Sequence, residues 1–272
     1  MSNQLPENLN HTFELDPPFF EDAKKIQTKI TLQGVEHDYK MEMPPCGVGL
    51  DLMTRHIHEF TGRIQALEIP DIHGGARFSL FRNSLHGRTS TAPMTGWLEV
   101  TNGQMNVPMT RAHFDNIGRA WIARAATTTE RADQVLWMRT VKKEPTITVE
   151  QFESNLLLTN QLNEWLPGNS PILNADEIKI TFFNGMPIKW KSAYRAANLN
   201  ANTDTFNSIL SYMRTCEKES NNKAKYNLLK QQQANGRSNY NGGRFQASGG
   251  RGKGRGNKTR YRPNNRSNER NV

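Results

Sequence analysis

Apolar, β-branched or aromatic residues occupy every second position over two stretches between residues 24 and 43, separated by Gln33 and Gly34. These residues are Ile26, Thr28, Ile30, Leu32, Val35, His37, Tyr39, Met41 and Met43. A period of two interrupted by a glycine predicts a β-hairpin that turns at Gly34. Because two strands alone are marginally stable, we expect the hairpin to pack on another element or to pair with another chain.

The hydrophobic period becomes helical after Gly49. Apolar residues then recur every three or four positions as far as Pro70, which predicts one amphipathic helix. Its inward residues are Leu50, Met53, Ile57, Phe60, Ile64 and Leu67. A shorter helix is expected from Ala76 to Leu85. It should end there because Gly87 provides a stop signal.

Residues 88–108 are rich in Thr, Gly, Asn and Pro, which predicts a loop anchored near Trp97. Thr110 is the expected N-cap of the next helix. That helix carries Phe114, Ile117 and Trp121 on one face. A further helix is expected over 129–140, and the residues KKEP at 142–145 should break it, since proline disfavours helix in the residue before it.

Four more helices are expected after residue 146. Their predicted caps or first residues are Thr148 with Gln151, Asn174, Pro187, and either Thr203 or Asp204. Thr148 and Gln151 have the spacing of a capping box, and Pro187 suits the first helical position. The last helix carries Phe206, Ile209, Leu210 and Met213 and should fade out after the charged residues 217–219.

These patterns together predict a mainly α protein with two small helical bundles. We expect an N-terminal segment with a β-hairpin over residues 1–48 and a first helical domain over 49–145. A second helical domain is expected over 146–225, followed by a disordered basic tail over 226–272. The sequence contains no internal repeat of the kind that indicates a solenoid.

The net charge of +9 resides in the last part of the chain. Residues 234–272 hold ten of the 35 basic residues and one of the 26 acidic residues, so the preceding residues carry 25 of each. A neutral body with a basic arm predicts a polyanionic partner. Glycine-rich stretches such as 249–256 have little to bury, and we therefore expect the arm to be disordered when free.

Aromatic residues are interspersed among the basic residues of this arm, which is typical of single-stranded RNA-binding tails. Guanidinium groups contact phosphates, and both arginines and aromatic rings stack on unpaired bases. The candidate nucleic-acid-binding residues are Arg237, Tyr240, Arg244, Phe245, Arg251, Lys253, Arg255, Lys258, Arg260, Tyr261, Arg262, Arg266 and Arg270. The alternatives are a solubilising tail or a general anion binder. An anionic membrane is less favoured, because no amphipathic helix or lipidation motif accompanies the charge.

Several chemistries have no signature in the sequence. No phosphate-binding loop, nucleophile elbow or aspartic protease signature occurs, and the two cysteines, Cys46 and Cys216, lack metal-ligand spacing. We therefore expect no catalytic residues, no metal and no cofactor. The N-terminus has no secretory signal and no apolar run approaches a membrane span, so a cytoplasmic protein with reduced thiols is expected.

Two further sets of residues have a structural and a functional interpretation. Trp137, Trp165 and Trp190 lie in helical stripes, which favours core packing over ligand stacking. A second set could add a basic rim for nucleic acid, although a solvated surface is the simpler interpretation. This set is Lys142, Lys143, Lys189 and Lys191.

The region from about residue 120 to 219 resembles the Gag protein of LTR retrotransposons, in particular copia-like elements of diatoms and other microbial eukaryotes. The residues that carry the resemblance are QVLWMR at 134–139, KEP at 143–145, TVEQF at 148–152, NQLNEWLP at 160–167, LNADEI at 173–178, FFNGMP at 182–187, Trp190, YM at 212–213 and CE at 216–217. Upstream, LFRNSLHG at 80–87 is similar to a segment of such Gag proteins. The resemblance lies in the ordered series rather than in one motif.

This resemblance implies a capsid-like body of two α-helical subdomains that self-assembles, with a nucleocapsid-like tail that packages RNA. The chain departs from many Gag proteins in having no Cys-His zinc knuckle, so RNA binding would depend on the Arg-Gly arm with weak sequence preference. Two alternatives remain: a host RNA-binding protein, such as a domesticated Gag, that forms no shell, and an RNA-modifying enzyme with a basic tail. The chain would be either a Gag-only product or part of a longer reading frame.

Overall fold

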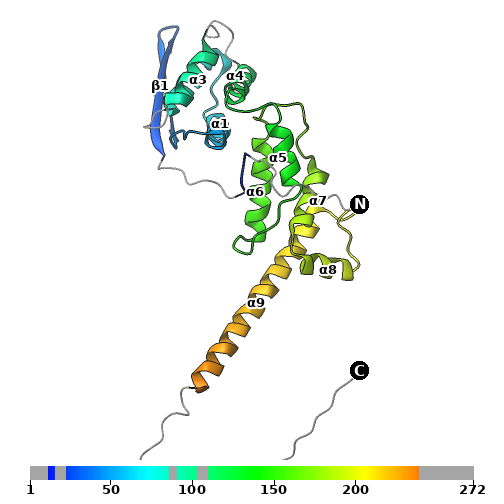
Figure 1. Ribbon diagram of the computed structural model, residues 1–272. Helices are drawn as coiled ribbons and strands as arrows, with labels where there is room; N and C mark the ends of the chain where they lie inside the picture. Colours follow the sequence, from blue (N-terminus) through cyan, green and yellow to red (C-terminus); the bar gives the residue numbers. More distant parts are fainter. Residues whose placement is uncertain (1–11, 16–22, 86–90, 103–109, 239–272) are drawn as a thin grey trace, which may run out of the picture. The chain divides into compact units, whose positions relative to one another are not determined.

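A computed structural model of the chain describes residues 12–15, 23–85, 91–102 and 110–238, and the described part is mainly helical with one small antiparallel sheet (Figure 1). The chain divides into two units, residues 1–221 and 222–272. Its elements are β1 (Lys24–Leu32), β2 (Val35–Met43), α1 (Leu50–Gln65), the 3-10 helix η1 (Asp71–His73), α2 (Gly74–Ser84), α3 (Thr91–Thr101), α4 (Arg111–Ala123), α5 (Glu130–Met138), α6 (Val149–Leu162), α7 (Ala175–Gly185), α8 (Ile188–Ala196) and α9 (Phe206–Ser238).

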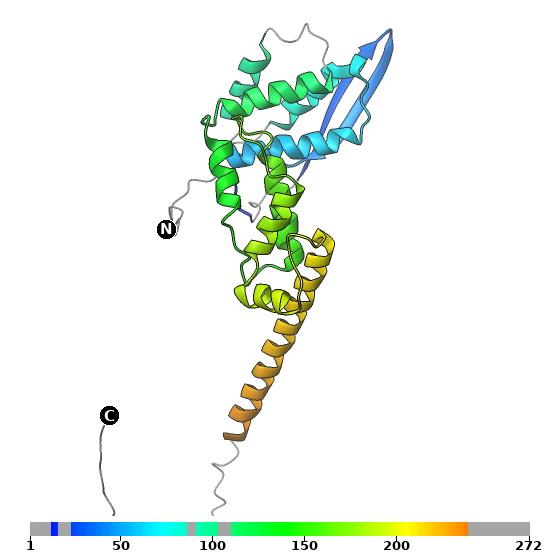
Figure 2. The same cartoon turned by 90° about the vertical axis from the view of Figure 1, so that its right-hand side faces the viewer.

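Strands β1 and β2 form the predicted hairpin, drawn in blue in Figure 2. Gln33 and Gly34 make its two-residue turn with φ angles of 51° and 79°, the left-handed region that such tight hairpin turns require. The hairpin packs on α2, as its marginal stability led us to expect, and Ile26 and Thr28 are buried there. The hydroxyl of Thr28 donates a 2.8 Å hydrogen bond to the Ser79 hydroxyl of α2.

The first hydrophobic core is dominated by aromatic side chains from α1 to α4. The large aromatic members from these helices are Phe60, Phe78, Phe81, Trp97, Phe114 and Trp121. The Phe81 ring centroid lies 4.4 Å from that of Trp97 and 4.9 Å from that of Phe60, within the range of favourable aromatic pairs. The apolar stripe predicted after Gly49 therefore faces this core along α1.

Our prediction of a loop over residues 88–108 is wrong in part, because α3 occupies Thr91–Thr101. Pro93 lies in its first turn, where a missing N–H removes no intrahelical bond. Gly96 also lies within α3, and a Cβ there would come within 3.4 Å of Trp121 Nε1, so the glycine permits close packing of α3 on α4. Burial of Trp97, which is 2% exposed, overrides the weak local helix propensity. Residues 86–90 and 103–109 lie outside the described residues.

A second hydrophobic core joins α5 to α9. Its buried members are Val135, Met138, Val149, Phe152, Leu156, Leu173, Ile178, Phe182, Phe183, Met186, Tyr194, Ala201, Ile209, Leu210 and Met213. Helix α5 thus belongs to this core, although it precedes residue 145. Leu162 at the end of α6, with Trp165 and Leu166 after it, belongs to the first core, so α6 contributes to both. The boundary between the two hydrophobic cores therefore differs from the domain boundary predicted at residue 145.

Three predicted helix starts are confirmed by their caps. The Thr110 side chain accepts from the His113 N–H, and Thr148 with Gln151 forms the predicted capping box. Asn174 caps α7 and forms a second capping box with Glu177.

Several predicted helix boundaries are shifted, and α2 begins at Gly74 and ends at Ser84 instead of spanning Ala76 to Leu85. Helix α5 ends at Met138 rather than at Thr140, and Pro187 precedes α8 instead of occupying its first position. The cap of α9 is neither Thr203 nor Asp204: the Thr205 hydroxyl accepts from the Ser208 N–H at 3.2 Å. Asp204 is engaged elsewhere, because its carboxylate accepts hydrogen bonds from the Tyr194 hydroxyl at 2.5 Å and from the Asn200 N–H at 2.9 Å.

Helix α9 continues well beyond the predicted end of the last helix. It runs from Phe206 to Ser238, so the expectation that disorder begins at residue 226 is wrong for 226–238. The sequence from 220 to 235 contains no proline or glycine that would break a helix. Residues 239–272 lie outside the described residues.

Candidate nucleic-acid interface

Most of the thirteen residues predicted to bind nucleic acid are not described by the structure. Arg237 falls within the backbone of α9, in its last turn. Outside the described residues lie Tyr240, Arg244, Phe245, Arg251, Lys253, Arg255, Lys258, Arg260, Tyr261, Arg262, Arg266 and Arg270. The structure therefore describes the helix that leads to them, α9, as far as Ser238.

The first part of α9 is held in the second core. Ile209 and Met213 are fully buried, and the Phe206 ring lies 5.2 Å from that of Phe182 in an edge-to-face arrangement. The Tyr212 ring makes a similar contact with Tyr194 at 4.9 Å. These contacts confirm the predicted inward face of the last helix and fix where α9 begins.

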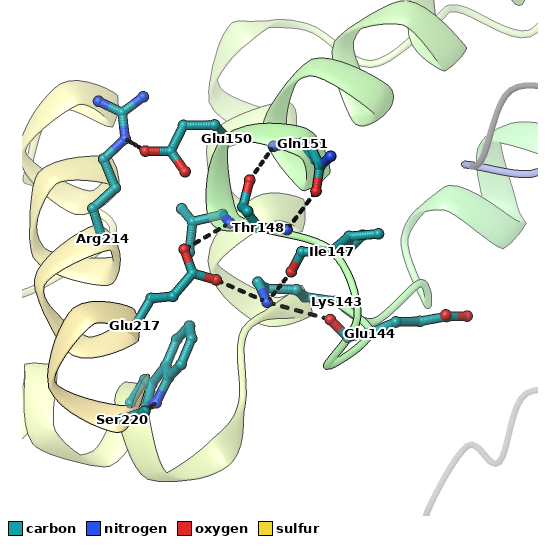
Figure 3. Close-up of polar contacts among 11 residues, drawn as sticks. Lys143, Glu144, Ile147, Thr148, Glu150, Gln151, Arg214, Glu217 and Ser220 are labelled. Carbon is teal, nitrogen blue, oxygen red and sulfur yellow. Dashed lines mark hydrogen bonds and ion pairs between the residues drawn. The ribbon is translucent and has the colours of Figure 1, made fainter. Parts of the chain in front are cut away.

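A buried ion pair joins α9 to the residues that precede α6 (Figure 3). Lys143 Nζ lies 3.1 Å from Glu217 Oε1, and the two side chains are only 4% and 15% exposed. The same ammonium donates to the carbonyl oxygens of Ile147 at 2.5 Å and Glu144 at 3.2 Å. Glu217 Oε2 accepts from the N–H of Val149 at 3.1 Å. Because Val149 is the first residue of α6, this carboxylate satisfies a helix N–H that has no intrahelical partner and complements the positive helix end.

Two neighbouring contacts extend this connection along α9. Arg214 Nε lies 2.8 Å from Glu150 Oε1 of α6, and Trp190 Nε1 of α8 donates to the Ser220 hydroxyl at 3.2 Å. The Lys143 ammonium also lies 5.5 Å from the Trp190 ring centroid, within cation–π range. Arg214, Glu217 and Ser220 are three residues apart, so one side of α9 makes all three contacts.

This ion pair changes the interpretation of Lys143, one of the four lysines that could form a basic rim for nucleic acid. The Lys143 ammonium is buried and paired, so it is not a surface contact for phosphate. Lys189 is exposed on α8. The remaining two lysines share one hydrogen-bond acceptor. Lys142 Nζ and Lys191 Nζ both donate to the Asn184 carbonyl oxygen, at 3.2 Å and 2.9 Å.

Arg195 adds a third positive charge beside these two lysines. It follows Lys191 by one helical turn on α8, and its guanidinium carbon lies 5.8 Å from the Phe183 ring centroid. Burial lowers the pKa of Lys191, and the positive charges of Lys142 and Arg195 lower it further. We name Lys142, Lys191 and Arg195 the α8 basic cluster. Arg195 was not among the residues predicted from the sequence, although its spacing of four residues from Lys191 on a predicted helix places the two on one face.

Burial shifts the pKa values of two titratable groups of the first core. Burial raises the pKa of the Cys46 thiol to about 12, and burial lowers the pKa of His56 to about 4. His56 Nε2 lies 2.8 Å from the Ser84 hydroxyl inside the first core. Cys46 and Cys216 are both free thiols, in agreement with the sequence prediction. Within the described residues, no three His, Cys, Asp or Glu side chains are placed to hold a metal ion.

Comparison with protein-family models, curated proteins and solved structures found no match to this chain. The resemblance to Gag proteins therefore depends on the ordered residues quoted above. Among the helices of the described residues, none is long and apolar enough to cross a bilayer.

Proposed function

We propose that this chain is a Gag-like structural protein that assembles into a capsid-like particle and packages single-stranded RNA through residues 234–272. The observation that carries the proposal is the charge distribution: this segment holds ten basic residues and one acid, while the rest of the chain is balanced. Counterion release from phosphates would provide most of the affinity, with weak sequence preference. The protein would act in the cytoplasm, without a cofactor and without catalysis.

The presence of two separate hydrophobic cores supports a capsid-like body. Under this proposal, the first core belongs to a capsid N-terminal-like subdomain and the second core to a C-terminal-like one. Copies of the chain would associate through the body, and the RNA would be bound by the tails. The buried residues of α9, Ile209, Leu210 and Met213, belong to the second core of this body.

Salt-dependent RNA binding tests the role of the tail. For single strands, the logarithm of affinity changes with the logarithm of salt concentration by about −0.7 per phosphate contact, so ten contacts would give a slope near −7. We expect roughly −3 to −6, because some basic residues will remain solvated. Deleting residues 234–272 should remove most of this slope and affinity. A deleted chain that binds single-stranded RNA as tightly as the full chain would contradict the assignment.

A second candidate is a host RNA-binding protein, such as a domesticated Gag, that forms no shell. Within residues 1–272, Cys46 and Cys216 form no Cys-His zinc knuckle, so RNA binding by this segment would depend on its basic arm under this alternative as well. Genomic context separates the two, because long terminal repeats and a polymerase reading frame nearby would indicate an active element.

A further inference from the structure

The α8 basic cluster carries more positive charge than its own surroundings neutralise. Asn184 is in the last turn of α7, where carbonyl groups lack intrahelical partners and attract cations. A helix end is equivalent to roughly half of one negative charge. It therefore offsets only part of the charge of Lys142, Lys191 and Arg195.

Two carboxylates of the second core pair with other cations, and Glu144, two residues after Lys142, accepts a 3.4 Å hydrogen bond from the Thr146 hydroxyl. Glu177 of α7 pairs with Arg139 at 2.8 Å, and Glu217 pairs with Lys143 at 3.1 Å. Over the part of the chain that the structure describes, no ion pair joins a carboxylate to any member of the cluster. The charges that lower the pKa of Lys191 are positive, and no carboxylate raises it. An external anion would relieve this repulsion.

The cluster has a geometry that suits a phosphate group. Because Lys142 Nζ and Lys191 Nζ both contact the Asn184 oxygen, the two nitrogens are at most about 6 Å apart. Charge-assisted hydrogen bonds to phosphate span about 2.7–2.9 Å, so one phosphate between the two ammonium groups can contact both. Arg195 adds a guanidinium one turn along α8 from Lys191, for the same or the next phosphate.

We propose that the α8 basic cluster is a second contact site for the phosphate backbone of single-stranded RNA, on the folded body and separate from residues 234–272. This inference rests on the proposed RNA-binding function and adds a fixed contact to it. A contact on the body would hold RNA close to the second core, whereas the basic tail alone leaves its position undefined. The contact reads phosphate and carries no base preference.

The test compares K142Q/K191Q with the charge-matched control K24Q/K25Q in the full chain. Lys24 and Lys25 are exposed lysines on β1, so both variants remove the same charge from the surface of the body. Binding of a fluorescein-labelled 20-nucleotide poly(U) is measured by anisotropy from low to high salt. We expect the slope of K142Q/K191Q to fall in magnitude by about 1.4, or ~0.7 per lysine, and that of the control to stay at the full-chain value.

The outcomes separate the two proposals. If the unmodified chain does not bind poly(U), the proposed function fails. If it binds and the two variants behave alike, only the cluster assignment is overturned. Polyglutamate is titrated in the same way as a model of an acidic protein. If K142Q/K191Q loses binding to polyglutamate but keeps its binding to poly(U), the cluster contacts an acidic protein partner, and the assignment is also overturned.

Thermal unfolding followed by circular dichroism verifies that each variant folds. Should K142Q/K191Q fail to fold, K191Q and K25Q form a second matched pair. The expected decrease in slope is then about 0.7 for K191Q and none for K25Q. Equal slopes for this pair would overturn the assignment in the same way.

Discussion

The Lys143 ammonium and the Glu217 carboxylate lie 3.1 Å apart and are almost withdrawn from solvent. Lys143 precedes α6 and Glu217 lies in α9, so the pair connects the start of the tail-bearing helix to the second core. Each partner also serves the backbone: Lys143 satisfies carbonyl groups before α6, and Glu217 satisfies the N–H of Val149. Neither charge can therefore be removed without leaving buried polar groups unpaired.

Replacing Glu217 by alanine should lower the free energy of unfolding of the second core by about 3–5 kcal/mol, because it leaves Lys143 buried without a counter-charge. Glu219→Ala is the matched control, since Glu219 is exposed two residues further along α9. That substitution should change stability by less than about 0.5 kcal/mol. Urea unfolding followed by far-UV circular dichroism measures both. Equal midpoints for the two variants would show that the pair contributes nothing to stability.

Trp97→Ala should destabilise the first core by about 3–5 kcal/mol, because Trp97 is 2% exposed among aromatic rings. The neighbouring Leu98 is 44% exposed on the same helix and provides a control of similar polarity. Leu98→Ala should be nearly neutral. The comparison tests whether α3 packs on α4, and a small effect of Trp97→Ala would contradict the position of α3.

Stability should fall between about pH 6.5 and pH 4 because of His56. Burial lowers the pKa of this histidine to about 4 in the folded chain, so the unfolded chain binds more protons in this interval. The contribution of His56 to the free energy of unfolding is fully present above its pKa in the unfolded chain. It is lost as the pH falls towards its pKa in the folded chain. It amounts to on the order of 3 kcal/mol, at about 1.36 kcal/mol per pKa unit.

Chemical unfolding of the full chain and of His56→Gln at pH 7.5 and pH 4.5 measures this contribution. The substitution should lower stability at pH 7.5, and the remaining pH dependence should be smaller than in the full chain. If both chains lose the same stability on acidification, His56 does not titrate as proposed.

The aromatic residues of the tail should contribute affinity that is independent of salt. Replacing Tyr240, Phe245 and Tyr261 by alanine removes stacking worth about 1–3 kcal/mol for each base that stacks, while every phosphate contact remains. Anisotropy titrations with poly(U) should show weaker binding with an unchanged salt slope. Replacing Arg251, Arg255 and Arg260 by glutamine should instead reduce the slope. Identical behaviour of the two triple variants would argue against base stacking.

The features that could be predicted from the sequence are those that adjacent residues determine. The hairpin follows from its alternation and from Gly34, and the capping box follows from the spacing of Thr148 and Gln151. Helix α3 could not be predicted, because its composition is that of a loop and its stability comes from the burial of Trp97 in tertiary contacts. The α9 cap was displaced for a similar reason: Asp204 is used by Tyr194, which leaves Thr205 to cap the helix.

The candidate site was only partly predictable as well. The charge of the tail and the lysines near α8 are visible in the sequence. The pairing of Lys143 with Glu217 and the approach of Lys142 to Lys191 are not, because the partners are separated by several helices. Only the Lys191–Arg195 spacing, one turn on one helix, carried local information.

Electron microscopy of the purified full chain mixed with single-stranded RNA tests the central proposal most directly. Under the Gag-like proposal, closed particles of uniform size form with RNA, and the chain lacking 234–272 fails to enclose RNA. A body that remains monomeric with RNA at high protein concentration, or that forms only small irregular complexes, would contradict capsid assembly and would favour an RNA-binding protein that forms no shell.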